Sequence, residues 1–105
     1  MAWQILPFLF LGNSYDANNL IFLKNNNIKT VISVWELKLI NIDDNIKYYN
    51  FFAYDNPNQN LYDIIFKCFD IIEKNKVYGN ILIHCFQFLS GNDWVGILFI
   101  TKFRL

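Results

Sequence analysis

His84 and Cys85 stand side by side, directly after a short apolar run over residues 80–84. This run predicts a buried strand that ends at the cysteine. In parallel sheets, ligands bind at the carboxyl ends of the strands. A loop that leads from there into a helix N-terminus presents backbone N–H groups to an anion and lowers the pKa of a cysteine. His84 would add to this effect if it is charged or hydrogen-bonded.

Two interpretations of this pair are open at this point. In the functional one, Cys85 is a thiolate nucleophile beside an anion-binding loop. In the structural one, Cys85 is a small buried hydrophobic residue and His84 is its neighbour by chance. These two residues alone do not separate the interpretations.

Asp55 bears on this choice because it lies on a loop after another predicted strand, 30 positions before Cys85. If the two strands are parallel neighbours, both loops leave the same edge of the sheet. A cysteine that attacks phosphorus needs an acid to protonate the leaving oxygen, and Asp55 could supply that proton. Taken alone, Asp55 is better explained as a turn residue before Asn56 and Pro57.

Strands and helices alternate along the chain, which predicts an α/β fold with a mainly parallel central sheet flanked by helices. The expected strands cover residues 3–5, 8–11, 30–35, 48–53 and 80–84. The expected helices cover residues 17–25 and 61–76.

Asp16 is the predicted cap of the first helix, with a buried face made by Leu20, Phe22 and Leu23. Three asparagines, residues 25–27, are expected to end it. The second helix has the clearer signals: a cap at Asn60, a stop at Gly79 and an apolar stripe at helical spacing. The stripe consists of Leu61, Ile64, Ile65, Cys68, Phe69, Ile71 and Ile72.

The length of 105 residues predicts a single domain over residues 1–105. Hydrophobic residues make up 54% of the chain and charged residues 17%, which excludes a disordered or charged low-complexity segment. Nine basic residues balance nine acidic ones, so no basic surface predicts a nucleic-acid partner. No apolar stretch approaches the ~20 residues of a membrane span. Without a targeting segment, the expected location is the cytoplasm or the nucleus, with no membrane partner.

The stretch Ile5–Val34 (ILPFLFLG…A…LIFLKNNNIKTVISV) resembles the opening of the dual-specificity protein phosphatases, in the cysteine-based tyrosine phosphatase superfamily. Asp55, the helix that follows it and the segment NILIHCFQ resemble later parts of the same family, in the same order and spacing. The resemblance covers residues 3–87.

This resemblance implies a tyrosine-phosphatase-like fold in which Cys85 is the nucleophile and Asp55 the general acid. The phosphate-binding loop would consist of His84, Phe86, Gln87, Phe88, Leu89, Ser90 and Gly91. The family's mechanism needs no metal and no organic cofactor. The implied partner is a phosphorylated protein, dephosphorylated at phosphotyrosine, phosphoserine or phosphothreonine.

The signature loop then departs from the family. An arginine is expected at position 91, where this chain has Gly91, and a glycine is expected at position 88, where it has Phe88. Ser90 matches the serine that often precedes the arginine. The lone arginine, Arg104, lies thirteen positions too late. The chain also ends before the family's C-terminal helices, which predicts a partial domain.

Three accounts are compatible with these observations. The chain is a defective or mis-spliced version of a genuine dual-specificity phosphatase, with the break after Gln87. Alternatively, it is a pseudophosphatase, a binding module that holds partners without turnover. In the third account the resemblance is superficial, and this is a small structural α/β protein. The transcript sequence across codons 85–95 would separate the first account from the second.

Overall fold

The computed structural model describes residues 2–35, 41–52, 61–85 and 102–103. Within these ranges it has five strands and three helices, α1 to α3. The strands are β1 (Trp3–Leu6), β2 (Leu9–Gly12), β3 (Ile28–Trp35), β4 (Lys47–Phe52) and β5 (Asn80–Cys85). The helices are α1 (Ser14–Ala17), α2 (Leu20–Asn25) and α3 (Leu61–Asn75).

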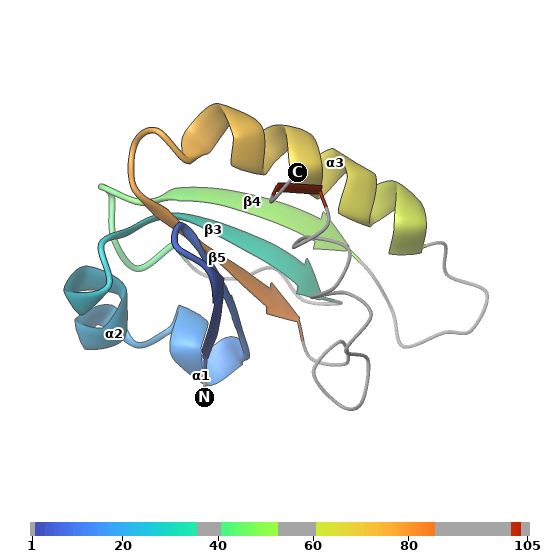
Figure 1. Ribbon diagram of the computed structural model, residues 1–105. Helices are drawn as coiled ribbons and strands as arrows, with labels where there is room; N and C mark the ends of the chain where they lie inside the picture. The colour runs from blue at the N-terminus through green and yellow to red at the C-terminus, as the bar shows by residue number, and fades with distance from the viewer. Residues whose placement is uncertain (1, 36–40, 53–60, 86–101, 104–105) are drawn as a thin grey trace.

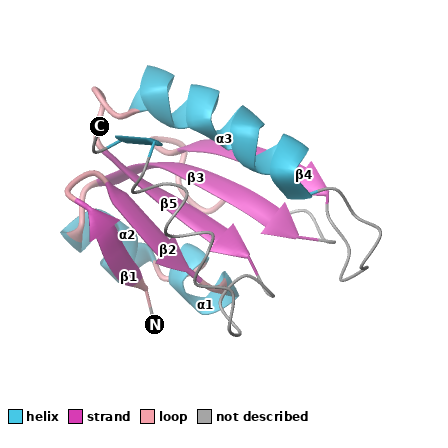
Figure 2. Ribbon diagram, turned by 45° about the vertical axis from the view of Figure 1, so that its right-hand side comes forward, coloured by secondary structure: helices cyan, strands magenta, loops and turns pink. Residues whose placement is uncertain are grey.

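One sheet contains all five strands, in the order β1-β2-β5-β3-β4. β2, β5, β3 and β4 are mutually parallel, and β1 pairs antiparallel with β2 across the turn at Pro7. In Figure 2, the arrowheads of these four strands therefore point to one edge of the sheet, and the arrowhead of β1 points to the opposite edge. The predicted mainly parallel α/β sheet is confirmed, and residues 80–84 form its central strand.

α3 covers one face of this sheet (Figure 1). Four residues of its predicted stripe are buried in the core on this face: Ile64, Ile65, Cys68 and Ile72. Phe69 and Ile71 pack against that core as partly buried residues, while Asp70, Glu73 and Lys74 are exposed as expected. The helical apolar spacing therefore gave the correct buried side of α3.

α1 and α2 lie on the opposite face (Figure 1). The single helix expected over residues 17–25 is wrong, because two short helices occupy this region. Asn13, not Asp16, caps α1, and Asn19 caps α2 by accepting a hydrogen bond from the Phe22 N–H at 3.1 Å. Asparagine side chains compete with the backbone for such hydrogen bonds, and this breaks the helix between its two halves.

The buried face predicted for the first helix is also partly wrong. Leu23 is fully buried and Phe22 packs against the core, but Leu20 is 38% exposed because it opens the second short helix. The predicted end of this region is confirmed, since Asn27 has a positive φ of 52°. No helix within the described ranges is long and apolar enough to cross a membrane.

Near the C-terminus, Phe103 packs on the α3 side of the sheet. Its ring makes edge-to-face contacts with Phe8 at 5.6 Å and with Phe69 at 5.9 Å between centroids. The Lys76 ammonium lies 5.5 Å from the centroids of both Phe8 and Phe103. These contacts stabilise the packing of Phe103 against the β1–β2 turn and against α3.

The turns before β3 and β5 are joined to each other by hydrogen bonds. Asn80 donates its backbone N–H to the Asn27 carbonyl at 2.9 Å and its side-chain amide to the Asn26 carbonyl at 2.8 Å. Gly79, with a φ of 152°, precedes Asn80, and a Cβ on it would collide with the Lys29 side chain. This position therefore requires glycine for both its backbone conformation and its space.

We predict that Gly79→Ala lowers the free energy of unfolding by about 1–3 kcal/mol, the cost of holding a side chain in such a conformation. Urea unfolding followed by circular dichroism measures this change. Lys74→Ala on the exposed side of α3 is the matched control and should change the free energy of unfolding by less than ~0.5 kcal/mol. Equal stability of Gly79→Ala and the unmodified chain would contradict the turn described here.

Candidate active site

β5 brings Cys85 to the edge of the sheet where the parallel strands end. Ile81, Leu82 and Ile83 on this strand are at most 2% exposed, because both faces of the sheet are covered. In the register, Cys85 pairs with Val34 of β3, and His84 pairs with Gly12 of β2. The carboxyl ends of β2, β3 and β5 thus lie together around the cysteine, as the sequence predicts.

β4, the strand that precedes Asp55, ends at the same edge. Phe51 of β4 pairs with Val34, the residue that also pairs with Cys85 on the other side of β3. Two strand spacings, about 10 Å, therefore separate β4 from β5 at this level. Asp55 follows three positions after β4 ends at Phe52 and lies outside the described residues, so its place beside Cys85 stays a prediction.

The predicted phosphate-binding loop also lies largely outside the described residues. This holds for Phe86, Gln87, Phe88, Leu89, Ser90 and Gly91. Of the predicted site, the structure describes the side chain of His84 and the backbone position of Cys85. No cluster of three or more His, Cys, Asp or Glu side chains that could hold a metal ion occurs in the described part of the chain.

His84 is completely buried, on the same sheet face as Leu82 and beside Ser33 of β3 in the register. Burial lowers the pKa of His84 to about 4, and the nearby Asp16 carboxylate opposes this shift only in part. The imidazole is therefore neutral near pH 7. A charged His84 beside Cys85 is therefore not supported at neutral pH, and the hydrogen-bonded alternative stays a prediction.

Asp16 takes a role that the sequence analysis missed. Its carboxylate accepts a hydrogen bond from the Asn13 N–H at 2.9 Å, and its own N–H donates to the Asn13 side chain at 3.1 Å, which completes a capping box. A Cβ on Gly12 would lie 2.8 Å from this carboxylate. Gly12 therefore allows Asp16 to approach the strand that pairs with His84.

The signal for this arrangement was present in the sequence. An Asn at position 13 and an acidic residue three positions later match a capping box. With Asp16 as the predicted cap, the helix was expected to start at residue 17, three residues after its actual start at Ser14. The electrostatic effect of Asp16 on His84 was therefore not predicted.

The curated proteins that are similar to this chain include two dual-specificity phosphatases. It is 27% identical over 100 residues to Dual specificity protein phosphatase 1B of Arabidopsis thaliana, an alignment that covers 94% of this chain and 60% of that protein. It is 28% identical over 103 residues to human Dual specificity protein phosphatase 18, covering 96% of this chain and 54% of that protein. The chain thus spans between half and two thirds of the length of these relatives. No family model matches it.

Among solved structures, the crystal structure of DUSP15 matches with a TM-score of 0.83 and 27% identity, covering 99% of this chain and 67% of that one. The chain is a relative of the dual-specificity protein phosphatases. The five-stranded sheet, with β5 at its centre, is the sheet of this dual-specificity phosphatase fold. The account in which the resemblance is superficial is therefore wrong.

Because this dual-specificity phosphatase relative has one histidine, the imidazole signals in an NMR titration belong to His84 without ambiguity. We predict that the imidazole of His84 titrates at about pH 4, because burial disfavours its charged form. Asp16→Asn should lower this pKa further, since the carboxylate favours the imidazolium. A titration near the ordinary value of 6.5 would contradict the burial of His84.

The same shift makes stability depend on pH. The unfolded chain binds a proton at His84 near pH 6.5, whereas the folded chain binds it only near pH 4. The folded state is therefore fully stabilised above pH 6.5 and loses about 2–3 kcal/mol between pH 7.5 and 4.5 through this residue. Urea unfolding at the two pH values measures the loss, and His84→Gln should show a correspondingly smaller one.

Proposed function

We propose that this chain is a phosphatase-like domain that keeps the Cys85 scaffold of the dual-specificity phosphatases but has little or no phosphatase activity. The observation that carries the proposal is the position of Cys85 at the end of the central parallel strand. Only one described edge of the sheet offers a cysteine at a strand end, and β4, the strand before Asp55, ends at that edge too.

In the family's reaction, transferred to this chain, the Cys85 thiolate attacks the phosphorus of a phosphorylated protein side chain. The bond to the ester oxygen breaks, and Asp55 gives its proton to that oxygen as it leaves. Asp55 then removes a proton from a water molecule, which attacks the phosphocysteine and releases inorganic phosphate and the thiolate. The reaction needs no metal and no organic cofactor.

Two residues of the loop oppose this reaction. A planar guanidinium at position 91 would bind two phosphoryl oxygens through parallel, charge-assisted hydrogen bonds, and Gly91 provides none. Losing a transition-state arginine costs on the order of 10³ to 10⁵ in the rate of phosphoryl transfer. Phe88 replaces a glycine where the backbone must approach the phosphate closely.

The neutral state of His84 supports the same conclusion. With a pKa of about 4, this residue supplies no positive charge beside Cys85 at neutral pH. A buried neutral imidazole therefore does not replace the missing arginine as a cation for the phosphoryl group.

The origin of the altered loop has two explanations within this proposal. A mis-joined transcript would place unrelated residues after Gln87. A pseudophosphatase would keep the fold and bind phosphorylated protein partners without turnover. The alignments to the two curated relatives cover 94% and 96% of the chain and so extend past Gln87, the predicted break. This extended similarity favours the pseudophosphatase, a binding module for phosphorylated proteins.

We predict that the purified 105-residue chain hydrolyses p-nitrophenyl phosphate no faster than its Cys85→Ser variant, because the transition-state charge lacks its arginine. Release of p-nitrophenolate measures the rate. Turnover clearly above the Cys85→Ser blank would contradict the proposed inactivity.

Restoring the loop is the positive half of the same test. Phe88→Gly combined with Gly91→Arg should raise the rate of hydrolysis by at least about 10³-fold over the unmodified chain. Adding Asp55→Asn to this pair should remove most of the gain with substrates whose leaving group needs a proton. Circular dichroism checks that each variant is folded. A folded double variant with no gain would contradict the assignment of Cys85 as the nucleophile.

A further inference from the structure

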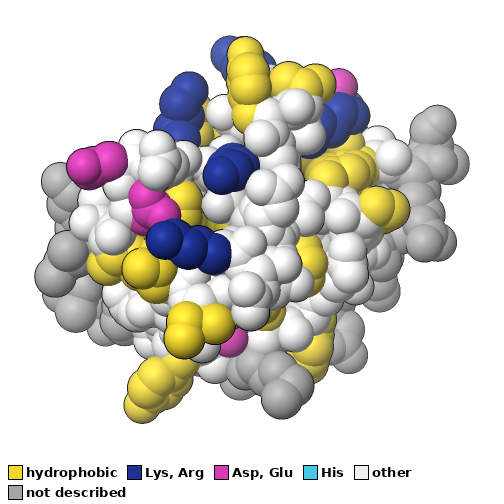
Figure 3. Space-filling view, turned by 90° about the vertical axis from the view of Figure 1, so that its left-hand side faces the viewer, with side chains coloured by type: hydrophobic (Ala, Val, Ile, Leu, Met, Phe, Trp, Pro, Cys, Tyr) yellow, Lys and Arg dark blue, Asp and Glu magenta, His cyan; other side chains and the backbone are white. Residues whose placement is uncertain are grey.

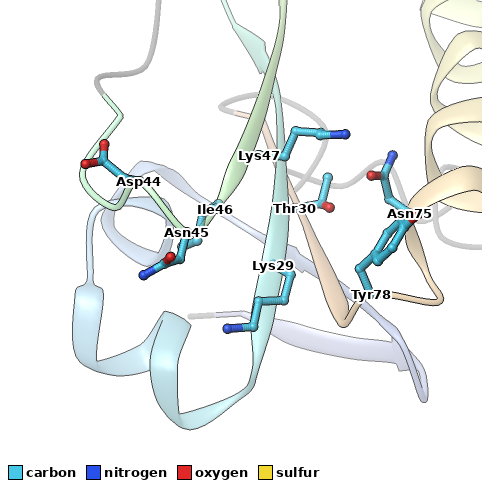
Figure 4. Close-up of a pocket in the computed structure, with 8 residues that line it drawn as sticks. All are labelled: Lys29, Thr30, Asp44, Asn45, Ile46, Lys47, Asn75 and Tyr78. Carbon is cyan, nitrogen blue, oxygen red and sulfur yellow. The ribbon is translucent and has the colours of Figure 1, made fainter.

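A cavity of about 450 Å³ lies at the edge of the sheet opposite to Cys85. It is lined by Lys29, Thr30, Asp44, Asn45, Ile46, Lys47, Asn75 and Tyr78 (Figure 4). These residues come from the beginnings of β3 and β4 and from the end of α3. Thr30 lies four residues before Val34, the partner of Cys85, so the cavity is about 13 Å along the strand from the candidate active site.

The inner wall of the cavity is polar and fixed. Thr30 and Asn75 are 2% and 4% exposed, and they face each other from β3 and α3 (Figure 4). The Asn75 side-chain amide donates to the Ile71 carbonyl at 2.7 Å and to the Tyr49 hydroxyl at 3.3 Å. Both amide protons are thereby used, so Asn75 offers its oxygen to a ligand, while the Thr30 hydroxyl can donate or accept.

The outer wall carries positive charge. Lys29 and Lys47 line the cavity against a single carboxylate, that of Asp44. In the part of the chain that the structure describes, neither lysine forms an ion pair with an acidic side chain. Figure 4 shows the Lys47 ammonium extended toward the side of Asn75, with Asp44 at the far rim. Figure 3, which looks onto this edge of the molecule, shows lysine, acidic and apolar side chains at the surface.

Tyr78 adds an aromatic ring at the rim. Its side chain is 71% exposed, although its backbone N–H is held by the Asn75 carbonyl at 3.0 Å. A fixed backbone with an exposed ring is suited to covering one face of a small ligand. The volume of the cavity is within the ~300–1,000 Å³ that small-molecule sites have.

We propose that this cavity is a second, non-catalytic site for a small organic anion whose phosphate or carboxylate group is attached to a hydroxyl-bearing carbon skeleton. The oxyanion would pair with Lys47, whose ammonium extends toward Asn75, while Lys29, whose ammonium points to the opposite side in Figure 4, would add positive charge at the rim. The hydroxyl groups of the ligand would bond to Thr30 and to the oxygen of Asn75, and its skeleton would pack against Tyr78. The site is independent of the chemistry at Cys85, so it stands whether or not the chain hydrolyses phosphate esters.

The test is a titration of the ¹⁵N-labelled full chain followed by two-dimensional NMR. Ribose 5-phosphate and gluconate are the two anionic probes, and ribose is the neutral control. We expect the amide signals of Thr30, Lys47 and Tyr78 to shift with the anions, with a Kd on the order of 1 mM. A response to ribose 5-phosphate alone assigns a phosphate ligand, and a response to both anions assigns the oxyanion in general.

Two pairs of substitutions then locate the charge that matters. Lys29→Gln with Lys47→Gln should weaken binding about tenfold, whereas Lys24→Gln with Lys67→Gln removes the same charge from exposed positions outside the cavity and should leave the Kd unchanged. Equal weakening by both pairs would overturn the proposal, since it would show attraction by net charge alone. Equal binding of ribose, no binding, or shifts confined to the Cys85 edge would also overturn it.

Discussion

The burial of β5 between two parallel neighbours is the constraint on which the candidate site depends. An apolar strand covered on both faces is stable only inside a sheet with helices on each side. Ile81 and Ile83 pack toward α3, and Leu82 packs toward α1 and α2. With β5 fixed in this way, the register with β3 determines that Cys85 and the end of β4 lie at one edge of the sheet.

The same burial limits the chemistry at that edge. Side chains of β5 alternate between the two faces of the sheet, and His84 lies buried on the same face as Leu82. This burial keeps its imidazole neutral at physiological pH, although the Asp16 carboxylate is nearby. The scaffold therefore presents a cysteine without a neighbouring cation from β5. In the proposed function, stabilisation of a phosphoryl group depends on the loop after Cys85, and that loop carries Gly91 where the family has arginine.

The parts that the sequence predicted correctly are those in which burial and spacing agree. β5 and the stripe of α3 are examples, because a long amphipathic helix and an apolar strand each fit one environment. Residues 14–25 were predicted wrongly, because asparagines at 13, 18 and 19 offer several capping choices that local pattern does not rank. The neutral state of His84 depends on helices distant in sequence, so the adjacent Cys85 gave no sign of it. Asp55 and residues 86–91 remain predictions.

The distance between the Asp55 carboxylate and the Cys85 sulfur tests the central claim most directly. A crystal structure of the full chain with a phosphate analogue such as tungstate would measure it. The account predicts that both groups face one cavity at the carboxyl edge of β3, β4 and β5, within roughly 10 Å of each other. Finding the Asp55 carboxylate at the opposite edge of the sheet, or directed away from Cys85 into solvent, would contradict the phosphatase-like site.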